Sequence, residues 1–168
     1  MTSEYYTQAL VLAKEPTGES DSQVFLYTSD LGLVIAKAAG ARKIVSKLAG
    51  HLEPPNIIAV RLVQKNRFQI VDALKISALP KSNNWAPILD LVKELTAEGQ
   101  PDSELWRMIE GKSLEGGEIL RVLGFDRAFA VCQDCGAKTP DNFLLKRLEY
   151  VCSVCLAQSG SPAHFVLK

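Results

Sequence analysis

The chain has 168 residues, of which 47% are hydrophobic, and it carries 19 basic and 19 acidic side chains. This length allows one ordinary domain or two small ones, and the apolar fraction is far above that of a disordered chain. No apolar run approaches eighteen residues, so the sequence predicts no transmembrane helix, and we expect no membrane among its partners.

The balanced net charge hides an uneven distribution along the sequence. Residues 36–67 carry seven basic side chains against a single acidic one, a net charge of +6. Residues 79–131 carry six basic and nine acidic side chains, a net charge of −3. A basic first half joined to an acidic middle predicts an anionic partner for the first half alone.

Residues 1–79 are expected to form a nucleic-acid-binding domain of five β-strands. Alternating, β-branched and aromatic patterns, broken by turn-forming residues, predict strands at 6–13, 23–28, 33–36, 57–64 and 68–76. The segment 42–53 between the third and fourth strands has Ile44, Leu48 and Leu52 at helical spacing and predicts a short helix. This is the layout of an OB-fold barrel, although periodicity alone is equally consistent with another small barrel.

A short helical region is predicted for residues 80–130, where the hydrophobic period changes. The first helix has Pro87 in its first turn, with Asn83 and Asn84 as candidate caps. Two shorter helices are expected at residues 102–110 and 118–123. The expected fold class is therefore α+β, with an N-terminal five-stranded OB-fold barrel, a short helical segment and a C-terminal four-cysteine module.

The only cysteines of the chain form two CxxC pairs with sixteen residues between them: Cys132, Cys135, Cys152 and Cys155. Each CxxC turn directs two thiolates at one point, and two such turns complete a tetrahedral four-sulfur shell suited to Zn²⁺. Because four thiolates leave no open coordination position, the metal is expected to be structural. We therefore predict a zinc-ribbon-like module and tail at residues 131–168.

Disulfides and redox chemistry are the alternatives for these cysteines. The sequence starts with Met1-Thr-Ser-Glu and shows neither the basic nor the apolar region of a signal peptide, so we expect a cytoplasmic protein. A reducing cytosol disfavours disulfides, and a redox CxxC normally occurs once rather than as a matched pair. The spacing favours zinc.

Catalysis finds little support in the sequence, and we expect no enzyme and no catalytic residue. His51 and His164 stand alone, without an HExxH or HxE pattern. A phosphate-binding GxxxxGK[ST] loop and a GxSxG nucleophile elbow are both missing from the sequence.

Six short segments follow one another along the chain: residues 9–12 (ALVL), 18–21 (GESD), 36–42 (AKAAGAR), 52–54 (LEP), 119–125 (ILRVLGF) and 132–136 (CQDCG). Taken in this order, they resemble the RecO family of bacterial recombination-mediator proteins. This chain is shorter than the usual family member, with few helices before the cysteines and little after Cys155. The resemblance covers about residues 5–76 and 118–155.

The resemblance implies a role in DNA repair and recombination. Members of the family bind single- and double-stranded DNA, anneal complementary strands, and act with RecR, in some bacteria with RecF, to help RecA displace single-stranded-DNA-binding protein. For this chain it implies DNA and RecR as partners, single-stranded-DNA-binding protein as a further candidate partner, and an association with the bacterial nucleoid.

The basic side chains of the first half are the expected DNA contacts, because lysines and arginines along a groove neutralise phosphates without reading sequence. They are Lys37, Arg42, Lys43, Lys47, Arg61, Lys65 and Arg67. Their alternative interpretation is an ordinary solvated face. Phe25, Tyr27 and Phe68 are the aromatic residues available for base stacking, with the protein core as the alternative for Phe25 and Tyr27.

Two other functions compete with DNA binding. One is a protein-interaction adaptor that docks RecR or single-stranded-DNA-binding protein without strong DNA binding of its own. The other is a small zinc-ribbon factor of transcription or translation, which has no reason to carry the segments at 18–21 and 39–42.

Overall fold

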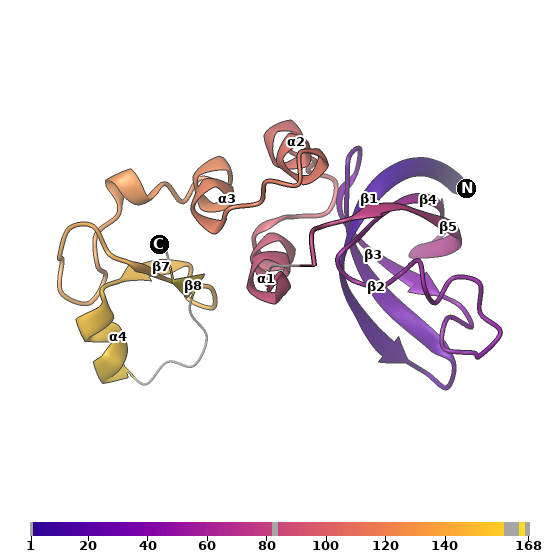
Figure 1. Ribbon diagram of the computed structural model, residues 1–168, viewed down its shortest axis with the longest axis horizontal. Coiled ribbons are helices and arrows are strands. Elements are labelled where there is room, and N and C mark those ends of the chain that lie inside the picture. The colour runs from indigo at the N-terminus through magenta and orange to yellow at the C-terminus, as the bar shows by residue number, and fades with distance from the viewer. Residues whose placement is uncertain (1, 82–83, 160–164, 167–168) are drawn as a thin grey trace. The chain divides into compact units, whose positions relative to one another are not determined.

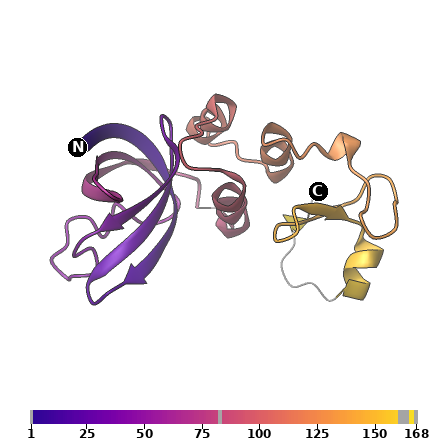
Figure 2. The ribbon, with the colours of Figure 1, turned by 180° about the vertical axis from the view of Figure 1, so that it is seen from behind.

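The computed structural model describes residues 2–81, 84–159 and 165–166 and divides into two compact units, Met1–Ser113 and Leu114–Lys168 (Figure 1). Figure 2 gives the reverse view of the same elements. The division falls inside the region predicted to be a separate helical segment, residues 80–130. Within the parts of the chain that the structure describes, no helix has the length and apolarity that crossing a bilayer requires.

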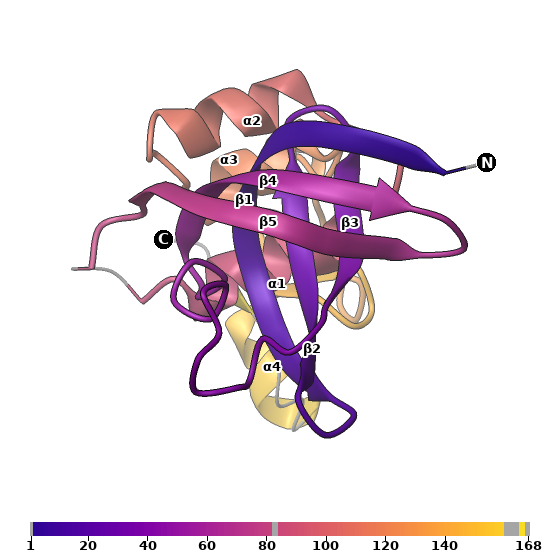
Figure 3. The same ribbon diagram turned by 90° about the vertical axis from the view of Figure 1, so that its right-hand side faces the viewer.

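Five strands of the first unit close into a barrel in the order β1-β2-β3-β5-β4, as the OB-fold prediction requires. In Figure 3, β4 and β5 cross the other strands of this barrel. The barrel closes where β3 and β5 run parallel, at the pairs Ala36–Phe68 and Lys37–Gln69. The strand bounds are β1 (Ser3–Thr17), β2 (Asp21–Thr28), β3 (Gly32–Ala38), β4 (Asn56–Gln64) and β5 (Phe68–Ala78).

Small and β-branched side chains fill the interior of the barrel. Successive residues of a strand point to opposite faces, so every second residue of each strand faces inward. The inward set is fully or almost fully buried and includes Ala9, Val11, Val24, Leu26, Val34, Ala36, Ile58, Val60, Leu62 and Ile70. This alternation is the pattern from which the sequence predicted β1, whereas β2 was predicted from its β-branched and aromatic residues.

The helix predicted at residues 42–53 is wrong: the described chain between β3 and β4 has turns and bends instead. The isolated turn bonds include the Ser46 amide donating to the Lys43 carbonyl and the Leu52 amide donating to the Leu48 carbonyl. Leu52 is buried in the core, but Ile44 is fully exposed, so the helical spacing does not correspond to one buried face. We call residues 39–55 the β3–β4 loop.

Helices α1 (Ala86–Leu95) and α2 (Ser103–Glu110) belong to the first unit. Pro87 stands at the start of α1 as expected, and Asn84 accepts a hydrogen bond from the Ala86 amide at 3.3 Å. The other proposed cap, Asn83, lies outside the described residues. Asp102 caps α2 by accepting from the amides of Glu104 and Leu105.

The two helices cover the outer side of β2, which explains why its outward-facing aromatic residues are buried. The ammonium of Lys93 in α1 lies 4.2 Å from the centroid of the Phe25 ring. At the start of α2, the amide of Asp102 donates to the Tyr27 hydroxyl at 2.8 Å. Tyr27 is fully buried and Phe25 is 8% exposed. Phe25 and Tyr27 are therefore core residues and not base-stacking residues.

The second unit is small and contains short elements around an aromatic cluster. The Phe143 ring makes edge-to-face contacts with Phe125 and Tyr150, with centroids 5.2 and 5.0 Å apart. Strand β8 was not predicted, yet it pairs with β6 in the sheet order β7-β6-β8. The elements are α3 (Gly116–Val122), the 3-10 helix η1 (Arg127–Phe129), β6 (Asn142–Leu144), β7 (Glu149–Val151), α4 (Ser153–Ser159) and β8 (Phe165–Val166).

Candidate metal centre and nucleic-acid interface

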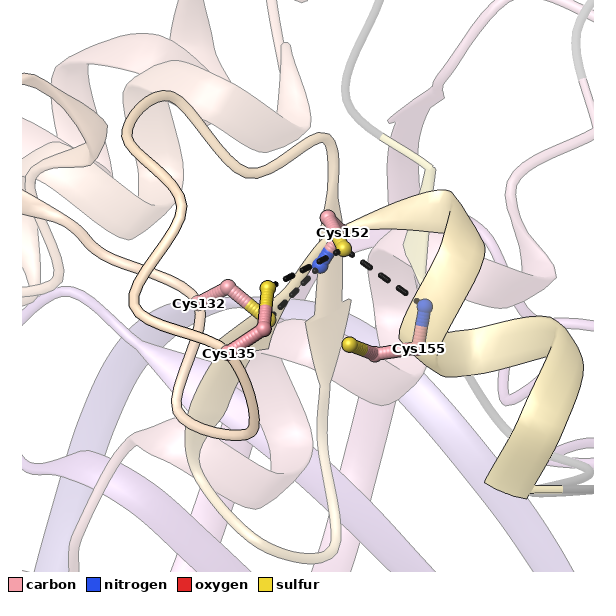
Figure 4. Close-up of side chains that lie close together, drawn as sticks. All are labelled: Cys132, Cys135, Cys152 and Cys155. Atoms are coloured by element: carbon pink, nitrogen blue, oxygen red, sulfur yellow. Dashed lines mark hydrogen bonds between the residues drawn. The ribbon is translucent and has the colours of Figure 1, made fainter.

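The four cysteines converge on one point from two turns of the second unit (Figure 4). Cys132 and Cys135 belong to a tight turn in which the Gly136 amide donates to the Cys132 carbonyl at 2.8 Å. Gly136 has a φ of 72°, which glycine adopts without steric cost. Cys152 follows β7 directly, and Cys155 lies in the first turn of α4. The first CxxC pair is therefore held by a tight turn, and the second by the junction between β7 and α4.

The spacing of the sulfur atoms fits a tetrahedral metal ion. All four Sγ atoms lie within 4.8 Å of one another, and those of Cys135 and Cys152 are 3.8 Å apart. A Zn–S bond of about 2.3 Å in tetrahedral geometry puts neighbouring sulfurs about 3.8 Å apart. The four residues therefore fit one metal ion with four thiolate ligands and no further protein ligand.

Backbone amides of the same turns point at the sulfur atoms. The Cys152 amide donates to Cys132 Sγ at 3.3 Å, and the Cys155 amide donates to Cys152 Sγ at 3.5 Å. The first of these bonds is the main reason that the pKa of Cys132 falls to about 6, because it stabilises the thiolate. Hydrogen bonding to Cys135 and Cys152 raises the pKa of the Cys155 thiol. A bound dication would stabilise all four thiolates together.

The metal centre is backed by the small core of the second unit. Cys132 is 1% exposed and packs with the buried side chains of Leu144 and Val151. The start of α4 is held by Asp141, which accepts hydrogen bonds from the Ser153 amide and hydroxyl. These bonds, the hydroxyl one foremost, lower the pKa of Asp141. The cysteines are thus held in place by packing and by a fixed helix start.

A groove of about 470 Å³ runs over the first unit where the β1–β2 turn, β2, β3 and the β4–β5 turn meet. We call it the basic groove. This is the surface on which OB-folds usually bind oligonucleotides. Its lining residues are Thr17, Gly18, Asp21, Gln23, Ile35, Ala36, Lys37, Gln64, Asn66, Arg67, Phe68 and Glu98.

Six of the seven predicted DNA contacts lie in or beside segments that form this groove. Lys37 and Arg67 line it, and together with Lys65 they border an adjoining hollow at the β4–β5 turn. The other three are exposed in the β3–β4 loop: Arg42, Lys43 and Lys47. Arg42 reaches the groove edge, because its guanidinium donates to the Gly18 carbonyl at 3.2 Å.

Arg61 lies elsewhere and is already paired. Its guanidinium forms an ion pair with Glu4 and lies 5.7 Å from the centroid of the Tyr6 ring. The hydrogen bond from Arg61 lowers the pKa of Glu4, so the pair stays charged. The structure does not bring Arg61 together with the other six basic residues.

Of the three aromatic candidates, Phe68 alone lines the basic groove; its ring also meets Tyr5 edge-on, at 5.8 Å between centroids. Sequence reasoning missed the polar lining residues Gln23 and Asn66, and the acidic Asp21. Asp21 comes from the segment GESD, but nothing in that pattern indicates that its carboxylate faces Lys37 on the neighbouring strand.

A second groove, of about 650 Å³, has three acidic residues and one basic residue among the described residues that line it. We call it the acidic groove. It contains the carboxylates of Asp30, Asp72 and Glu110 beside the exposed apolar side chains of Tyr6 and Leu74. Arg61 is the only basic residue among the described residues that line it. Among the described residues, none lines both grooves.

Comparison with known proteins agrees with this architecture. Residues 1–79 match the family model for the N-terminal domain of recombination protein O. The DNA repair protein RecO of Syntrophobacter fumaroxidans is 30% identical over 72% of this chain and 49% of its own length. The DNA repair protein RecO of Myxococcus xanthus is 34% identical over 63% of this chain and 47% of its own length. That of Pelotomaculum thermopropionicum is 24% identical over 95% of this chain and 72% of its own length.

The alignments to the first two relatives span about half of the relatives' length. The family model covers the barrel, and the longer alignments continue past it toward the cysteines. Together with the closed five-stranded barrel and the four-cysteine cluster, these matches identify the chain as a member of the RecO family.

Proposed function

We propose that this chain binds single- and double-stranded DNA through the basic groove and acts as a recombination mediator in DNA repair. In this role it anneals complementary strands and assists the loading of RecA. The observation that carries the proposal is the gathering of cations around a groove at the usual OB-fold binding surface. Cations there neutralise phosphates and release counterions, which gives affinity without sequence preference.

The lining of the basic groove also suits the other parts of a nucleotide. Phe68 is a partly buried aromatic residue in the lining that suits base stacking, while Gln23 and Asn66 offer amides that donate to and accept from sugars and base edges. Asp21 and Glu98 are the acidic exceptions, and Asp21 is neutralised by its ion pair with Lys37. DNA is therefore a better fit than a small anion, which needs fewer and closer donors.

We propose that the metal of the four-cysteine centre is Zn²⁺ and that its role is structural. The second unit has few buried side chains, and a metal cross-link between the two CxxC turns supplies stability that such a small core lacks. A four-thiolate shell is closed, so Zn²⁺ would hold the turns together without binding substrate. Cys132, Cys135, Cys152 and Cys155 are the proposed ligands.

Strand annealing is the test of the proposed function. Two complementary oligonucleotides with a fluorescence donor and acceptor report duplex formation, and we expect the chain to accelerate it. Changing Lys37, Lys65 and Arg67 together to Gln should abolish the acceleration. The control makes the same loss of charge at three exposed lysines that are not among the lining residues of the groove, by changing Lys112, Lys138 and Lys146 to Gln. Equal activity of both variants would remove the basic groove from the proposal.

A second candidate function is protein docking, and the acidic groove favours it. Carboxylates repel phosphates, so a groove with Asp30, Asp72 and Glu110 beside exposed apolar side chains suits a protein partner and not DNA. We propose RecR as a partner, with single-stranded-DNA-binding protein as a further candidate. Capture of purified RecR by the wild-type chain, and its loss on changing Asp72 to Lys, would support docking at this groove. Capture that is unchanged by Asp72→Lys would contradict that location.

A further inference from the structure

The tip of the β3–β4 loop presents two apolar side chains to solvent between basic ones. Ile44 is 105% exposed and Val45 is 86% exposed. Arg42 and Lys43 precede this pair and Lys47 follows it, and all three are exposed. Single exposed apolar residues are common on proteins, but two adjacent and almost fully exposed ones, flanked by three cations, are a distinct chemical surface.

The loop is attached to the barrel at both ends, so the position of its tip is restricted. At the start, Ala41 is buried and the Arg42 amide donates to the Ser20 carbonyl at 2.9 Å. At the end, Leu52 is fully buried, and the Asn56 side-chain amide donates to the carbonyls of Gly50 and His51 at 3.1 Å. The exposed pair therefore belongs to a loop whose Ala41, Leu48 and Leu52 pack against the barrel core.

A ligand for this tip must offer negative charge and apolar surface at close spacing. Nucleic acid does so, because phosphates alternate with base faces along the strand. The loop also borders the basic groove: Arg42 donates to Gly18 and the Gly40 amide donates to Asp21 at 2.8 Å, and both acceptor residues line the groove. An occupant of the groove would therefore pass close to the loop.

We propose that Ile44 and Val45 insert between neighbouring bases of single-stranded DNA while Arg42, Lys43 and Lys47 bind the adjacent phosphates. This inference rests on the proposed DNA binding and adds to it a contact with bases. Aliphatic side chains are known to act as such wedges, separating adjacent bases where basic residues hold the backbone. A strand with separated bases is ready to meet a complementary strand, which links the wedge to annealing.

The test uses the full chain and a single-stranded oligonucleotide that contains 2-aminopurine, whose fluorescence is quenched by stacking on neighbouring bases. Anisotropy of a second label on the same strand reports binding separately. We expect binding of the wild-type chain to raise the 2-aminopurine fluorescence. The variant Ile44→Ser/Val45→Ser should still bind, with affinity reduced by at most about tenfold. Its binding should leave the 2-aminopurine fluorescence at the level of the free oligonucleotide.

The control is Val71→Ser/Ile76→Ser, which removes two exposed apolar side chains from β5 that line neither groove, and it should behave as wild type. Equal base signals for wild type and Ile44→Ser/Val45→Ser would overturn the wedge and leave the proposed DNA binding intact. A flat anisotropy for the wild-type chain would overturn both. The variant Ile44→Ser/Val45→Ser could also keep the wild-type anisotropy and 2-aminopurine responses while it loses binding to phosphatidylglycerol vesicles. That result would assign the tip to anionic lipid and overturn the inference.

Discussion

Asp21 on β2 and Lys37 on β3 form an ion pair inside the basic groove, with 2.7 Å between Asp21 Oδ2 and Lys37 Nζ. The other carboxylate oxygen of Asp21 accepts the Gly40 amide at 2.8 Å. The hydrogen bond from Lys37 and then that from Gly40 hold the pKa of Asp21 below its usual range. Asp21 therefore keeps one groove cation neutralised while it anchors the start of the β3–β4 loop.

Replacing Asp21 by Asn is expected to strengthen DNA binding. Asn keeps an oxygen for the Gly40 amide but releases Lys37 to contact a phosphate. We expect a several-fold tighter complex at low salt and a salt dependence of log Kd that is steeper by about 0.7, the value for one added phosphate contact on a single strand. Fluorescence-anisotropy titrations at several salt concentrations measure both. Asp72→Asn, which makes the same charge change in the acidic groove, is the control and should have little effect.

The lowered pKa of Asp21 also predicts how DNA binding responds to pH. A carboxylate whose pKa is depressed by folding stabilises the native state above its unfolded pKa, and this contribution is lost as pH falls through the folded pKa. Between about pH 5 and pH 8 Asp21 therefore remains ionised, and the Asp21 pair contributes no pH dependence to binding. A change in affinity over this range that disappears in Asp21→Asn would contradict this assignment.

The β3–β4 loop should account for part of the salt dependence of DNA binding. Changing Arg42, Lys43 and Lys47 together to Gln removes three candidate phosphate contacts and is expected to flatten the slope by about 2, at about 0.7 per contact. Arg61→Gln should leave the slope unchanged, since that guanidinium is paired with Glu4 and stacked on Tyr6. A slope that depends on Arg61 and not on the loop would contradict the division of basic residues that the structure gives.

Loss of one cysteine should release the metal and unfold the second unit alone. Cys132 is the buried one of the four proposed ligands, so Cys132→Ser is expected to lower the zinc content from the proposed one ion per chain to well below one and to increase proteolysis after residue 113. Ala137→Ser, a change of similar size at an exposed neighbouring position, should retain both zinc and protection. Zinc at full stoichiometry in Cys132→Ser would contradict a four-cysteine site.

Gly32 is expected to be the glycine of the first unit that least tolerates a side chain. It has a φ of 68°, and a Cβ there would lie 2.6 Å from the Gln100 carbonyl oxygen and 2.8 Å from that of Ala97. Gly18 has a similar φ of 58° but open space around it. Urea denaturation should show a loss of about 2–4 kcal/mol for Gly32→Ala and about 1 kcal/mol for Gly18→Ala. Equal losses would mean that the segment between α1 and α2 does not pack against the β2–β3 turn.

The barrel could be predicted from the sequence because alternating, β-branched and aromatic segments are separated by turn-forming residues, and the metal centre because CxxC spacing is a local property. Helix α1 was predictable from apolar residues at helical spacing after Pro87, and α2 from the apolar Leu105, Trp106 and Ile109. In each of these cases the residues that decide the structure are close together in the sequence.

The predictions failed where contacts between distant segments decide. Ile44 has the same spacing to Leu48 as Leu48 has to Leu52, yet only the two leucines pack against the barrel core, because the loop follows its attachments to the β1–β2 turn, β2 and β4. In the sequence, Phe25 and Tyr27 resemble base-stacking residues of an OB-fold. In the structure they are covered by Lys93 and Asp102, which lie about 70 residues further along the chain. Strand β8 needs β6 as its partner, and its short sequence alone carries no strand pattern.

The central claim, that this chain binds DNA through the basic groove, is tested most directly by fluorescence anisotropy of labelled single-stranded DNA across a salt series with zinc-loaded protein. Micromolar or tighter binding that weakens steeply with salt, and that is lost when Lys37, Lys65 and Arg67 are changed to Gln, is the predicted result. An absence of binding at low salt would contradict the claim and leave docking of RecR as the better account.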